Sequence, residues 1–456
     1  MSTAQNDFMK AAEVNLQNIH LHDQMHEWRK LYNEKFTQAA TQFSNLSAAM
    51  QRAAHLRWKT IEHLDKYLIE FESNFIKTGG RVIWAQDTTD AAVEILNILK
   101  RNNIHTVVKT KSNTVAEINL NKILEEEVIS LVETDFADFI LQYEEESSTH
   151  MVMPALHKSK AELNDFFQKR FDLPEDSTEQ DMVRFTRKFL REEFFIAGAG
   201  ITGANFLVAD SGAIVISENE GNAHLCATVP RIHIVVCGID KIVPSLSDLD
   251  LLLSLLSVYG SAEKTMSYNH VITAPKSNDE KDGAEELILI LLDNGRSDIL
   301  AKETQRQALQ CIGCGACQTA SDLYNLIGGN VYGGPLQAIT APLIMNAAEY
   351  KFLSEAHTLG EGLNEICPVK IDFKKLLLQN RHDFVKEGLN SRNERWFFYA
   401  WKKAMLKREL MGWTGINTRK HILESLIKSK EGLRKMPASA PKSFNEWWRE
   451  NKRIKY

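Results

Sequence analysis

Three cysteines lie close enough in the sequence for their thiolates to face one metal centre. Cys311, Cys314 and Cys317 have the spacing C-x2-C-x2-C, and the small residues between them allow the backbone to wrap tightly around sulfur. A bacterial-type iron–sulfur run adds a fourth cysteine after three more residues, followed by proline. Here those positions carry Ser321 and Asp322, so a fourth ligand must come from elsewhere in the chain.

Cys367 is the remote cysteine with the right local form, because Pro368 follows it directly. In two-cluster ferredoxins the fourth cysteine of each run ligates the other cluster, so a distant fourth ligand is expected. We therefore predict one 4Fe–4S cluster with four thiolate ligands: Cys311, Cys314, Cys317 and Cys367.

The positions expected for a second cluster carry no cysteine, since Ser321, Gly360 and Leu363 occupy them. Random loss would not sort the two ligand sets so cleanly, and we predict one intact and one deleted site. Zinc binding and simple packed thiols are the alternatives, although zinc ribbons use a second C-x2-C pair that is missing here. Cys226 and Cys237 lie in apolar, strand-like segments, which is typical of inert buried thiols.

A second group of polar residues follows expected strands in the middle of the chain. Ligands of open α/β sheets bind at the carboxyl ends of the strands. The candidate pocket residues are Lys109, Lys111, Thr202, Asn205, Glu220 and Asn222. The lysines suit a carboxylate or phosphate, and glycine-loop amides suit an anion. The alternative is a set of turns with capping side chains; residues 198–206 lack the G-x-G-x-x-G spacing of a Rossmann site.

Strands and helices alternate in the segment that must position these residues. Short β-branched runs at 81–85 and 105–110 flank a helical period, a hairpin is expected at 205–217, and residues 231–240 form an apolar run. This alternation predicts an α/β fold with a parallel sheet and helices on both faces.

We divide the chain into four parts: an N-terminal helical region (1–76), an α/β domain (77–300), a helical cysteine module (301–382) and a basic helical C-terminal tail (383–456). Residues 391–456 hold 17 Lys and Arg against 6 Asp and Glu, a net charge of +11, whereas the rest of the chain carries −17. Such a tail favours docking to the chain's own acidic body, to an acidic partner or to an anionic surface. A solvated helical face is the plain alternative.

The totals fit a globular chain with a large core, since 44% of the 456 residues are hydrophobic and 25% are charged. The N-terminus lacks the apolar stretch of a secretory signal. The longest apolar runs, 249–260 and 287–292, are too short to cross a bilayer. We expect a soluble cytoplasmic protein with no transmembrane segment and no nucleic-acid partner.

Several segments of the chain resemble the lactate utilization protein B family, the iron–sulfur subunit of bacterial L-lactate oxidation. They are residues 149–163, 200–249, 311–329, 332–343 and 365–378, within a similarity of roughly residues 60–400. The resemblance implies a LUD-type domain, similar in fold to sugar-phosphate isomerases, followed by a ferredoxin-like module with two clusters. This chain departs from that pattern at the second cluster.

The resemblance also implies partners: a Cys-rich heterodisulfide-reductase-like subunit, a second LUD protein and a small organic acid. The expected function is electron transfer within an oxidoreductase complex that converts L-lactate, or a related 2-hydroxy acid, to pyruvate. One alternative is a module that binds an organic anion or nucleotide and uses the cluster as a structural staple. A zinc-stapled scaffold is a third interpretation.

Overall fold

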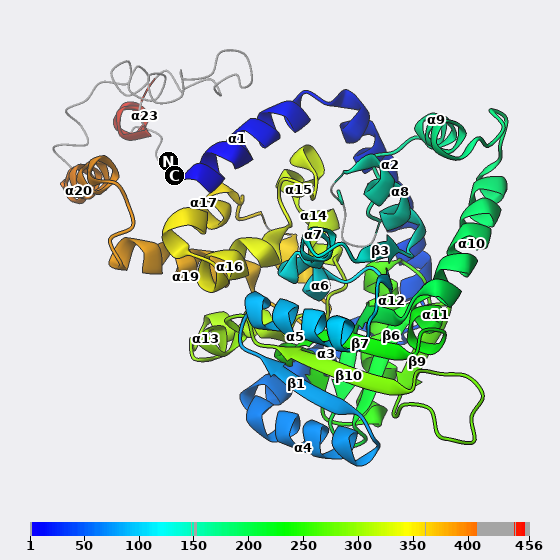
Figure 1. The fold of residues 1–456 in the computed structure, drawn as a ribbon. Coiled ribbons are helices and arrows are strands. Elements are labelled where there is room, and N and C mark those ends of the chain that lie inside the picture. The colour runs from blue at the N-terminus through cyan, green and yellow to red at the C-terminus, as the bar shows by residue number, and fades with distance from the viewer. Residues whose placement is uncertain are drawn as a thin grey trace. The chain divides into compact units, whose positions relative to one another are not determined.

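The computed structural model describes residues 2–146, 148–149, 153–360, 362–407, 442 and 444–451. It forms two compact units, Met1–Phe384 and Val385–Tyr456, which we describe separately. Figure 1 gives the element labels. The four-part division made from the sequence stays a prediction.

A six-stranded sheet organises the first unit. Its strands, in order across the sheet, are β1 (Arg81–Ala85), β10 (Glu286–Leu292), β7 (Ile232–Gly238), β4 (Ala199–Gly203), β2 (Thr106–Lys109) and β3 (Ser130–Glu133). Every neighbouring pair is parallel. All seven residues of β7 are buried, because apolar side chains alternate between two covered faces. The predicted parallel sheet is confirmed.

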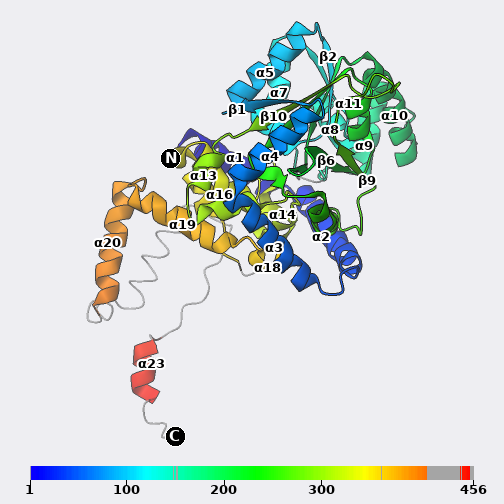
Figure 2. The ribbon, with the colours of Figure 1, turned by 90° about the horizontal axis from the view of Figure 1, so that it is seen from below.

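Helices cover the two faces of this sheet, as expected for parallel strands. On one face pack α5 (Thr88–Arg101), α6 (Asn113–Ile118) and α7 (Leu120–Glu126), which share an apolar core with Ile234 and Ile290. On the other face packs α4 (Leu64–Lys77), whose Phe71 and Phe75 meet Val235 and the strand β10. Figure 2 shows α4 and α5 on opposite sides of β1 and β10.

An aromatic cluster covers the β2–β3 end of that second face. It is built by α8 (Phe136–Glu144), α9 (Lys160–Phe171) and α10 (Glu179–Ile196), which pack on Val108 and Val132. The rings of Phe139 and Phe171 lie 5.7 Å apart. Both α9 and α10 begin at capping boxes, which fix where these helices start.

A small second sheet separates the large sheet from the cysteine segment. Its strands are β8 (Ile242–Val243), β5 (Phe206–Val208), β6 (Ala213–Glu218) and β9 (Tyr268–Ile272). Leu207 and Ile214 face the large sheet. Phe206 and Val215 face the helices around the cysteines. Because side chains alternate along a strand, the small sheet contributes one face to the core of the large sheet and the other face to the core around the cysteines.

The hairpin expected at 205–217 is confirmed as β5 and β6, which pair antiparallel. Gly212 sits in its turn with φ +67°, and a Cβ there would lie 2.5 Å from the backbone nitrogen of Phe75. The sequence did not reveal that this hairpin leaves the main sheet, because both of its faces are apolar.

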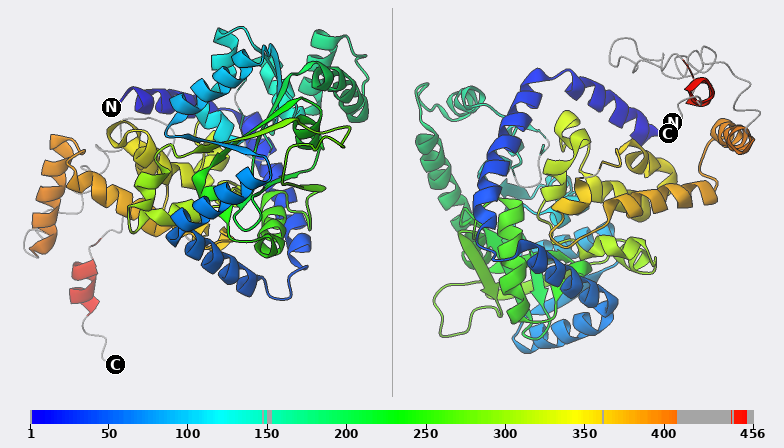
Figure 3. Two further views of the ribbon diagram at one scale, coloured as in Figure 1. Left: turned by 60° about the horizontal axis from the view of Figure 1, so that its bottom comes forward. Right: turned by 180° about the vertical axis from the view of Figure 1, so that it is seen from behind.

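The remaining helices of the first unit lie mostly around the cysteines. They are α1 (Thr3–Leu16), α2 (Ile19–Ala40), α3 (Leu46–Glu62), α11 (Asn222–Thr228), α12 (Leu249–Gly260), α13 (Arg296–Leu300), α14 (Ala316–Ala320), α15 (Asp322–Ile327), α16 (Pro335–Ile344), α17 (Ala347–Ala356), α18 (Leu363–Ile366) and α19 (Phe373–Lys386). Three 3-10 turns join them: η1 (Ile239–Lys241), η2 (Leu246–Asp248) and η3 (Gln305–Gln310). Figure 3 shows α1 beside α15 and α17.

The second unit contains the described helices α20 (Arg392–Leu406) and α23 (Phe444–Asn451). Much of the predicted basic tail, including residues 408–441, lies outside the described residues. Among the helices that are described, none is long and apolar enough to span a bilayer.

Candidate functional site

The cysteine loop begins where η3 ends. Cys311 follows this 3-10 turn, and Cys317 lies in the first turns of α14. Between them Gly313 (φ +75°) and Gly315 (φ +76°) adopt left-handed conformations that glycine reaches without strain. A Cβ on Gly313 would meet no atom within 4 Å, so there is open space beside the loop. The glycines thus reverse the chain twice within five residues.

Packing brings Cys367 to this loop from the end of α18. Cys314 and Cys367 are buried in one apolar core, and Cys311 and Cys317 pack against it. Burial raises the pKa of the Cys314, Cys317 and Cys367 thiols, and the neighbouring cysteines raise it further. For Cys367 the pKa reaches about 12. The four cysteines predicted as ligands are therefore within electrostatic reach of one another.

Backbone N–H groups point at the cysteine sulfurs. The Gly313 N–H donates to Cys311 Sγ at 3.3 Å, and the Ile371 N–H donates to Cys367 Sγ at 3.4 Å. Backbone hydrogen bonds from Ala316 and Leu336 oppose the rise in the pKa of Cys314 and Cys317. Such donors stabilise thiolates, which are the form that binds metal.

The donor set at the loop consists of four thiols with backbone N–H donors beside two of the sulfurs. Within the described part of the chain, no group of three or more His, Cys, Asp or Glu side chains is arranged to hold one metal ion. A zinc ion draws its four ligands to about 2.3 Å, whereas a cubane of four irons holds its cysteines further apart. The four thiols, the open space beside Gly313 and the N–H donors have the chemistry that an iron–sulfur cluster would use.

Ser321 and Leu363, which occupy positions expected for a second ligand set, have structural roles. Ser321 is 2% exposed, and its Oγ caps α15 by accepting from the Tyr324 N–H at 3.3 Å. Leu363 is buried in the apolar core. A run ending at Cys367 would also place a cysteine at His357, which our sequence analysis missed although the spacing shows it. The His357 carbonyl accepts from Arg381 at 2.7 Å.

A buried guanidinium ties the cysteine loop to the sheets. Arg57 of α3 is 0% exposed and donates to the carbonyls of Leu309 and Gln310, at 3.0 and 3.1 Å. It also donates to the carbonyls of Asp240 and Ile242, at 2.5 and 2.6 Å. One side chain thus joins the residues before Cys311 to the segment after β7.

Further buried charges extend this network. Lys241 donates to the Cys311 carbonyl at 3.0 Å and to Asp240 at 2.7 Å. Arg296 bonds Asp240 and Glu117, each at 2.8 Å. Burial alone would raise the pKa of Asp240, but Lys241 and Arg296 hold it below its usual range. Cys311 therefore lies beside positive side chains. None of these residues was predicted, because only tertiary contacts bring them together.

The carboxyl ends of β2 and β3 carry a second polar group. Lys109 and Glu133 are opposite each other in the register and form a buried ion pair at 2.8 Å. Asn222 donates to Thr134 Oγ1 at 3.2 Å, and Glu220 accepts from the Phe136 N–H at 3.0 Å. These contacts place Lys109, Glu220 and Asn222 near one another at the carboxyl ends of β2 and β3, and their role in ligand binding stays a prediction.

Burial and nearby carboxylates shift acid groups at this edge. Burial is the main cause that raises the pKa of Asp138 to about 7, followed by Asp135 and Glu133. Burial and Asp135 raise the pKa of Glu220 in the same direction, while Lys111 lowers it. Lys111 thus acts on the same group of carboxylates. Sequence analysis missed Asp138, since an aspartate in the first turn of a helix is ordinarily a solvated residue.

Two predicted pocket residues lie apart from this edge group. The Thr202 hydroxyl pairs with His233 Nε2 at 2.8 Å, and both residues are buried. The Asn205 Oδ1 accepts from the Ser217 N–H at 2.8 Å within the small sheet. Both side chains thus make hydrogen bonds between neighbouring strands. This structural role is closer to the alternative of structural side chains than to a ligand pocket.

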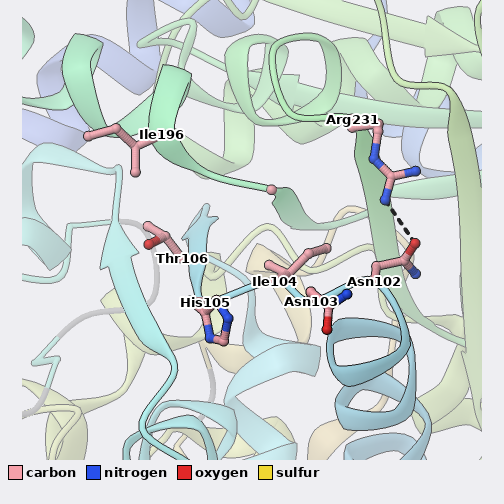
Figure 4. A pocket seen from close by; sticks show the side chains of 8 residues that line it. Asn102, Asn103, Ile104, His105, Thr106, Ile196 and Arg231 are labelled. Atoms are coloured by element: carbon pink, nitrogen blue, oxygen red, sulfur yellow. Dashed lines mark hydrogen bonds between the residues drawn. The ribbon is translucent and has the colours of Figure 1, made fainter.

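A hollow of about 260 Å³ lies at the opposite end of the sheet. Figure 4 shows it between the residues that precede β2, β4 and β7, with Arg231 donating to Asn102 Oδ1 at 2.8 Å. Its lining is Asn102, Asn103, Ile104, His105, Thr106, Ile196, Gly198 and Arg231. It faces neither the cysteines nor the carboxyl ends of the strands.

The sheet region and the polar edge together define a LUD-domain protein, since residues 68–292 match the family model described as the LUD domain. Lactate utilization protein B of Geobacillus sp. (strain WCH70) is 34% identical and covers 98% of both chains. Lactate utilization protein B of Bacillus subtilis (strain 168) is 39% identical over 77% of this chain and 74% of its own length. The chain belongs to the lactate utilization protein B family.

A relative from Escherichia coli (strain K12) carries a different description. It is named "Uncharacterized electron transport protein YkgF", is 34% identical, and covers 88% of this chain and 87% of its own length.

Proposed function

We propose that this chain is the iron–sulfur electron-transfer subunit of a complex that oxidises L-lactate, or a related 2-hydroxy acid, to pyruvate. The observation that carries the proposal is the meeting of Cys367 with the 311–317 loop, with N–H donors aimed at the sulfurs. Relatives named for lactate utilization and for electron transport support it.

A 4Fe–4S cluster supplies reversible one-electron transfer when bound. Oxidation of a 2-hydroxy acid to a 2-keto acid releases two electrons and two protons, so the bond-breaking step belongs on a partner subunit. Within this chain, Cys311, Cys314, Cys317 and Cys367 would hold the cluster. Arg57 and Lys241 would offset its negative charge, because both interact with Cys311.

Two partner subunits follow from the same proposal: a Cys-rich subunit of the heterodisulfide-reductase type and a second LUD protein. A chain with one cluster makes a short relay between them. The helices that carry the cysteines form, in this proposal, a ferredoxin-like module with its second site deleted, since Ser321 and Leu363 serve as a helix cap and a core residue.

The test compares Cys367→Ser with Cys237→Ala, a matched control at another buried cysteine outside the set. Protein purified without oxygen is analysed for iron and acid-labile sulfide, and by EPR before and after dithionite. We expect about four iron and four sulfide per chain in the wild type and in the control, with a signal on reduction. Cys367→Ser should lose most of both.

Three results would reject parts of this proposal. Full iron retention in Cys367→Ser would remove Cys367 as a ligand. About eight iron per chain would show that the second site is intact after all. Zinc as the sole metal in protein never exposed to air would make the loop a structural clip.

A second candidate function, a binding module for a small organic anion or nucleotide, is favoured by the polar edge of the sheet. Lys109, Lys111 and the raised-pKa carboxyl of Asp138 meet there. A redox titration separates the two functions. A cluster that cannot be reversibly reduced, in a protein whose melting temperature still rises with an added organic acid, would favour the binding module.

A further inference from the structure

The C-terminal unit carries a helix whose side chains are unburied. α20 starts at a capping box formed by Ser391 and Glu394, which sets its first turn. None of its residues is buried. Its exposed large apolar side chains are Trp396, Phe397, Phe398, Tyr399, Trp401, Met405 and Leu406. For Trp396 the exposed fraction reaches 73%. Apolar surface of this extent on a short helix needs a partner.

One side of α20 carries apolar residues and no basic residue. Successive residues on an α-helix are rotated by about 100°. Phe397, Trp401 and Met405 follow one another at intervals of four and form one stripe, and the first two rings stack at 6.3 Å. The other half of the helix carries the basic residues together with three further exposed apolar ones: Arg392, Arg395, Lys402 and Lys403, with Trp396, Tyr399 and Leu406. On that half Lys403 Nζ lies 5.5 Å from the centre of the Tyr399 ring.

The composition of the whole tail extends this pattern. Residues 391–456 carry a net charge of +11 and five of the eight tryptophans: Trp396, Trp401, Trp413, Trp447 and Trp448. Trp413 lies outside the described residues. In α23 the Phe444 ring stacks on Trp447 and Trp448 at 6.0 and 5.9 Å, and all three side chains are exposed. Tryptophan suits a boundary between water and an apolar phase, because its ring is apolar and its N–H is polar.

We propose that the C-terminal unit docks onto the surface of an anionic lipid bilayer, with α20 lying in the interface. Its stripe of Phe397, Trp401 and Met405 would enter the acyl region, and its lysines and arginines would meet the headgroups. Charge complementarity selects anionic lipid. The stripe of Phe397, Trp401 and Met405 contains no basic residue, which favours insertion into a membrane over a single-stranded nucleic acid face, where basic and stacking residues are interleaved.

Membrane docking by α20 does not require the proposed cluster. The docking proposal can therefore be tested separately from the proposed electron transfer. It gives the chain a second property, which is attachment to a membrane surface by a segment that does not span it. The cysteines belong to the first unit, and the docking residues belong to the second.

The experiment mixes the full-length protein with vesicles of equimolar phosphatidylglycerol and phosphatidylcholine, and separately with phosphatidylcholine alone. Co-sedimentation and tryptophan emission are measured. We expect binding to the anionic vesicles only, a blue shift of emission, quenching by brominated acyl chains, and release between about 50 mM and about 500 mM NaCl. Equal binding to both vesicles, or to neither, would overturn the proposal.

Two double variants separate charge from insertion. K402E with K403E should weaken binding by about tenfold or more, whereas the charge-matched control K30E with K35E, on exposed positions of α2, should not. F397S with W401S should weaken it similarly, while I69S with I76S, at exposed apolar positions of α4, should not.

The acidic-protein alternative has its own readout. If polyglutamate displaces the protein completely and F397S with W401S binds like the wild type, the tail recognises charge alone and membrane insertion is rejected. If instead F397S with W401S lowers the melting temperature of the protein without a change in vesicle binding, the helix packs on the chain itself and the proposal is likewise rejected.

Discussion

A single arginine holds the cysteine loop in place. Arg57 is fully buried and gives four hydrogen bonds to main-chain carbonyls of two separate segments. A buried charge is unfavourable unless its hydrogen bonds are made, and breaking such a set leaves both sides unsatisfied. The guanidinium suits this role because its donors form a rigid fork.

Arg57→Met should therefore destabilise the protein by about 3–5 kcal/mol. The methionine fills the volume but leaves four buried carbonyls without their donor. Urea unfolding of the first unit, followed by tryptophan fluorescence, measures the loss.

The matched control is Arg52→Met, an exposed position of the same helix, which should change stability by less than about 0.5 kcal/mol. Equal stability of the two variants would show that the four hydrogen bonds contribute nothing net.

Because the pKa of Asp138 is raised, we expect the stability of the protein to fall as pH rises. An acid in a salt bridge, whose pKa is lowered, has the opposite effect. Its pKa is about 7 in the folded protein, against about 4 for an unfolded aspartate. The folded state thus binds more protons between these pH values, so stability is full below about pH 4 and falls as pH rises through about 7. The decrease is at most about 4 kcal/mol by pH 8.

Thermal unfolding at a series of pH values tests this expectation. Asp138→Asn should make the melting temperature depend less on pH and should raise it above that of the wild type at pH 8. Asp250→Asn, at an exposed position of α12, should show the same dependence of melting temperature on pH as the wild type. A wild-type profile that rises from pH 5 to pH 8 and is unchanged by Asp138→Asn would contradict the raised pKa.

The sequence points to the proposed ligands more readily than to the residues around them. The four cysteines are recognisable because three have a local spacing and the fourth is followed by proline. Arg57 and Asp138 carry no such local mark. What distinguishes them is burial beside groups that are far away in the chain, and burial of a polar residue is a property of the folded state.

At the scale of elements, close approach of a helix and a strand shapes the polar edge. α11 crosses β4 at Gly200, where a Cβ would lie 1.8 Å from the Cys226 carbonyl oxygen. The glycines at 198–203 therefore serve packing, which explains why they lack the spacing of a nucleotide loop. α11 in turn carries Asn222 to Thr134.

Gly200→Ala should push α11 away and destabilise the protein by about 1–3 kcal/mol. Amide exchange should also increase in α11, and an organic anion that binds at the polar edge should bind less tightly. Gly360→Ala is the control, because its Cβ would meet no atom within 4 Å. Wild-type exchange in the Gly200 variant would show that the helix has room to adjust.

The order of strand and helix was predictable from hydrophobic periodicity, but the division into two sheets was not. β5 and β6 read as an apolar hairpin, and the parallel strand β7 reads as an equally apolar run. Fully buried strands look alike in sequence whichever sheet they join. The small sheet differs from the large one in what covers its second face, which is the set of helices around the cysteines. That contact forms only in the folded protein.

At the scale of the whole molecule, the cysteine region is the meeting point of distant segments. One apolar core contains residues of α1, α2, α12, the small sheet and the helices from α14 to α19. A bound group at its centre would stabilise all of them, since anything that binds the folded form alone raises stability.

Removal of iron with a chelator under reducing conditions should thus lower the melting temperature of the first unit by at least about 5 °C. Calorimetry before and after removal, and again after reconstitution with iron and sulfide, measures the change. Cys367→Ser should melt like the iron-free wild type. Identical melting of the loaded and iron-free proteins would mean that the core forms without the group.

The bond from Arg57 to Gln310 joins residues 253 positions apart. A ribosome that adds about 5–20 residues per second needs about 13–50 s to make that stretch. Arg57 is therefore made long before its carbonyl partners at Leu309 and Gln310. Cys367 emerges later still, so the proposed cluster, with all four thiolates, would form only after synthesis of most of the chain. Nascent chains stalled before residue 367 would expose three thiols to an oxidant or a wrong metal, and under the proposed function the timing of translation would be part of how the cluster is loaded.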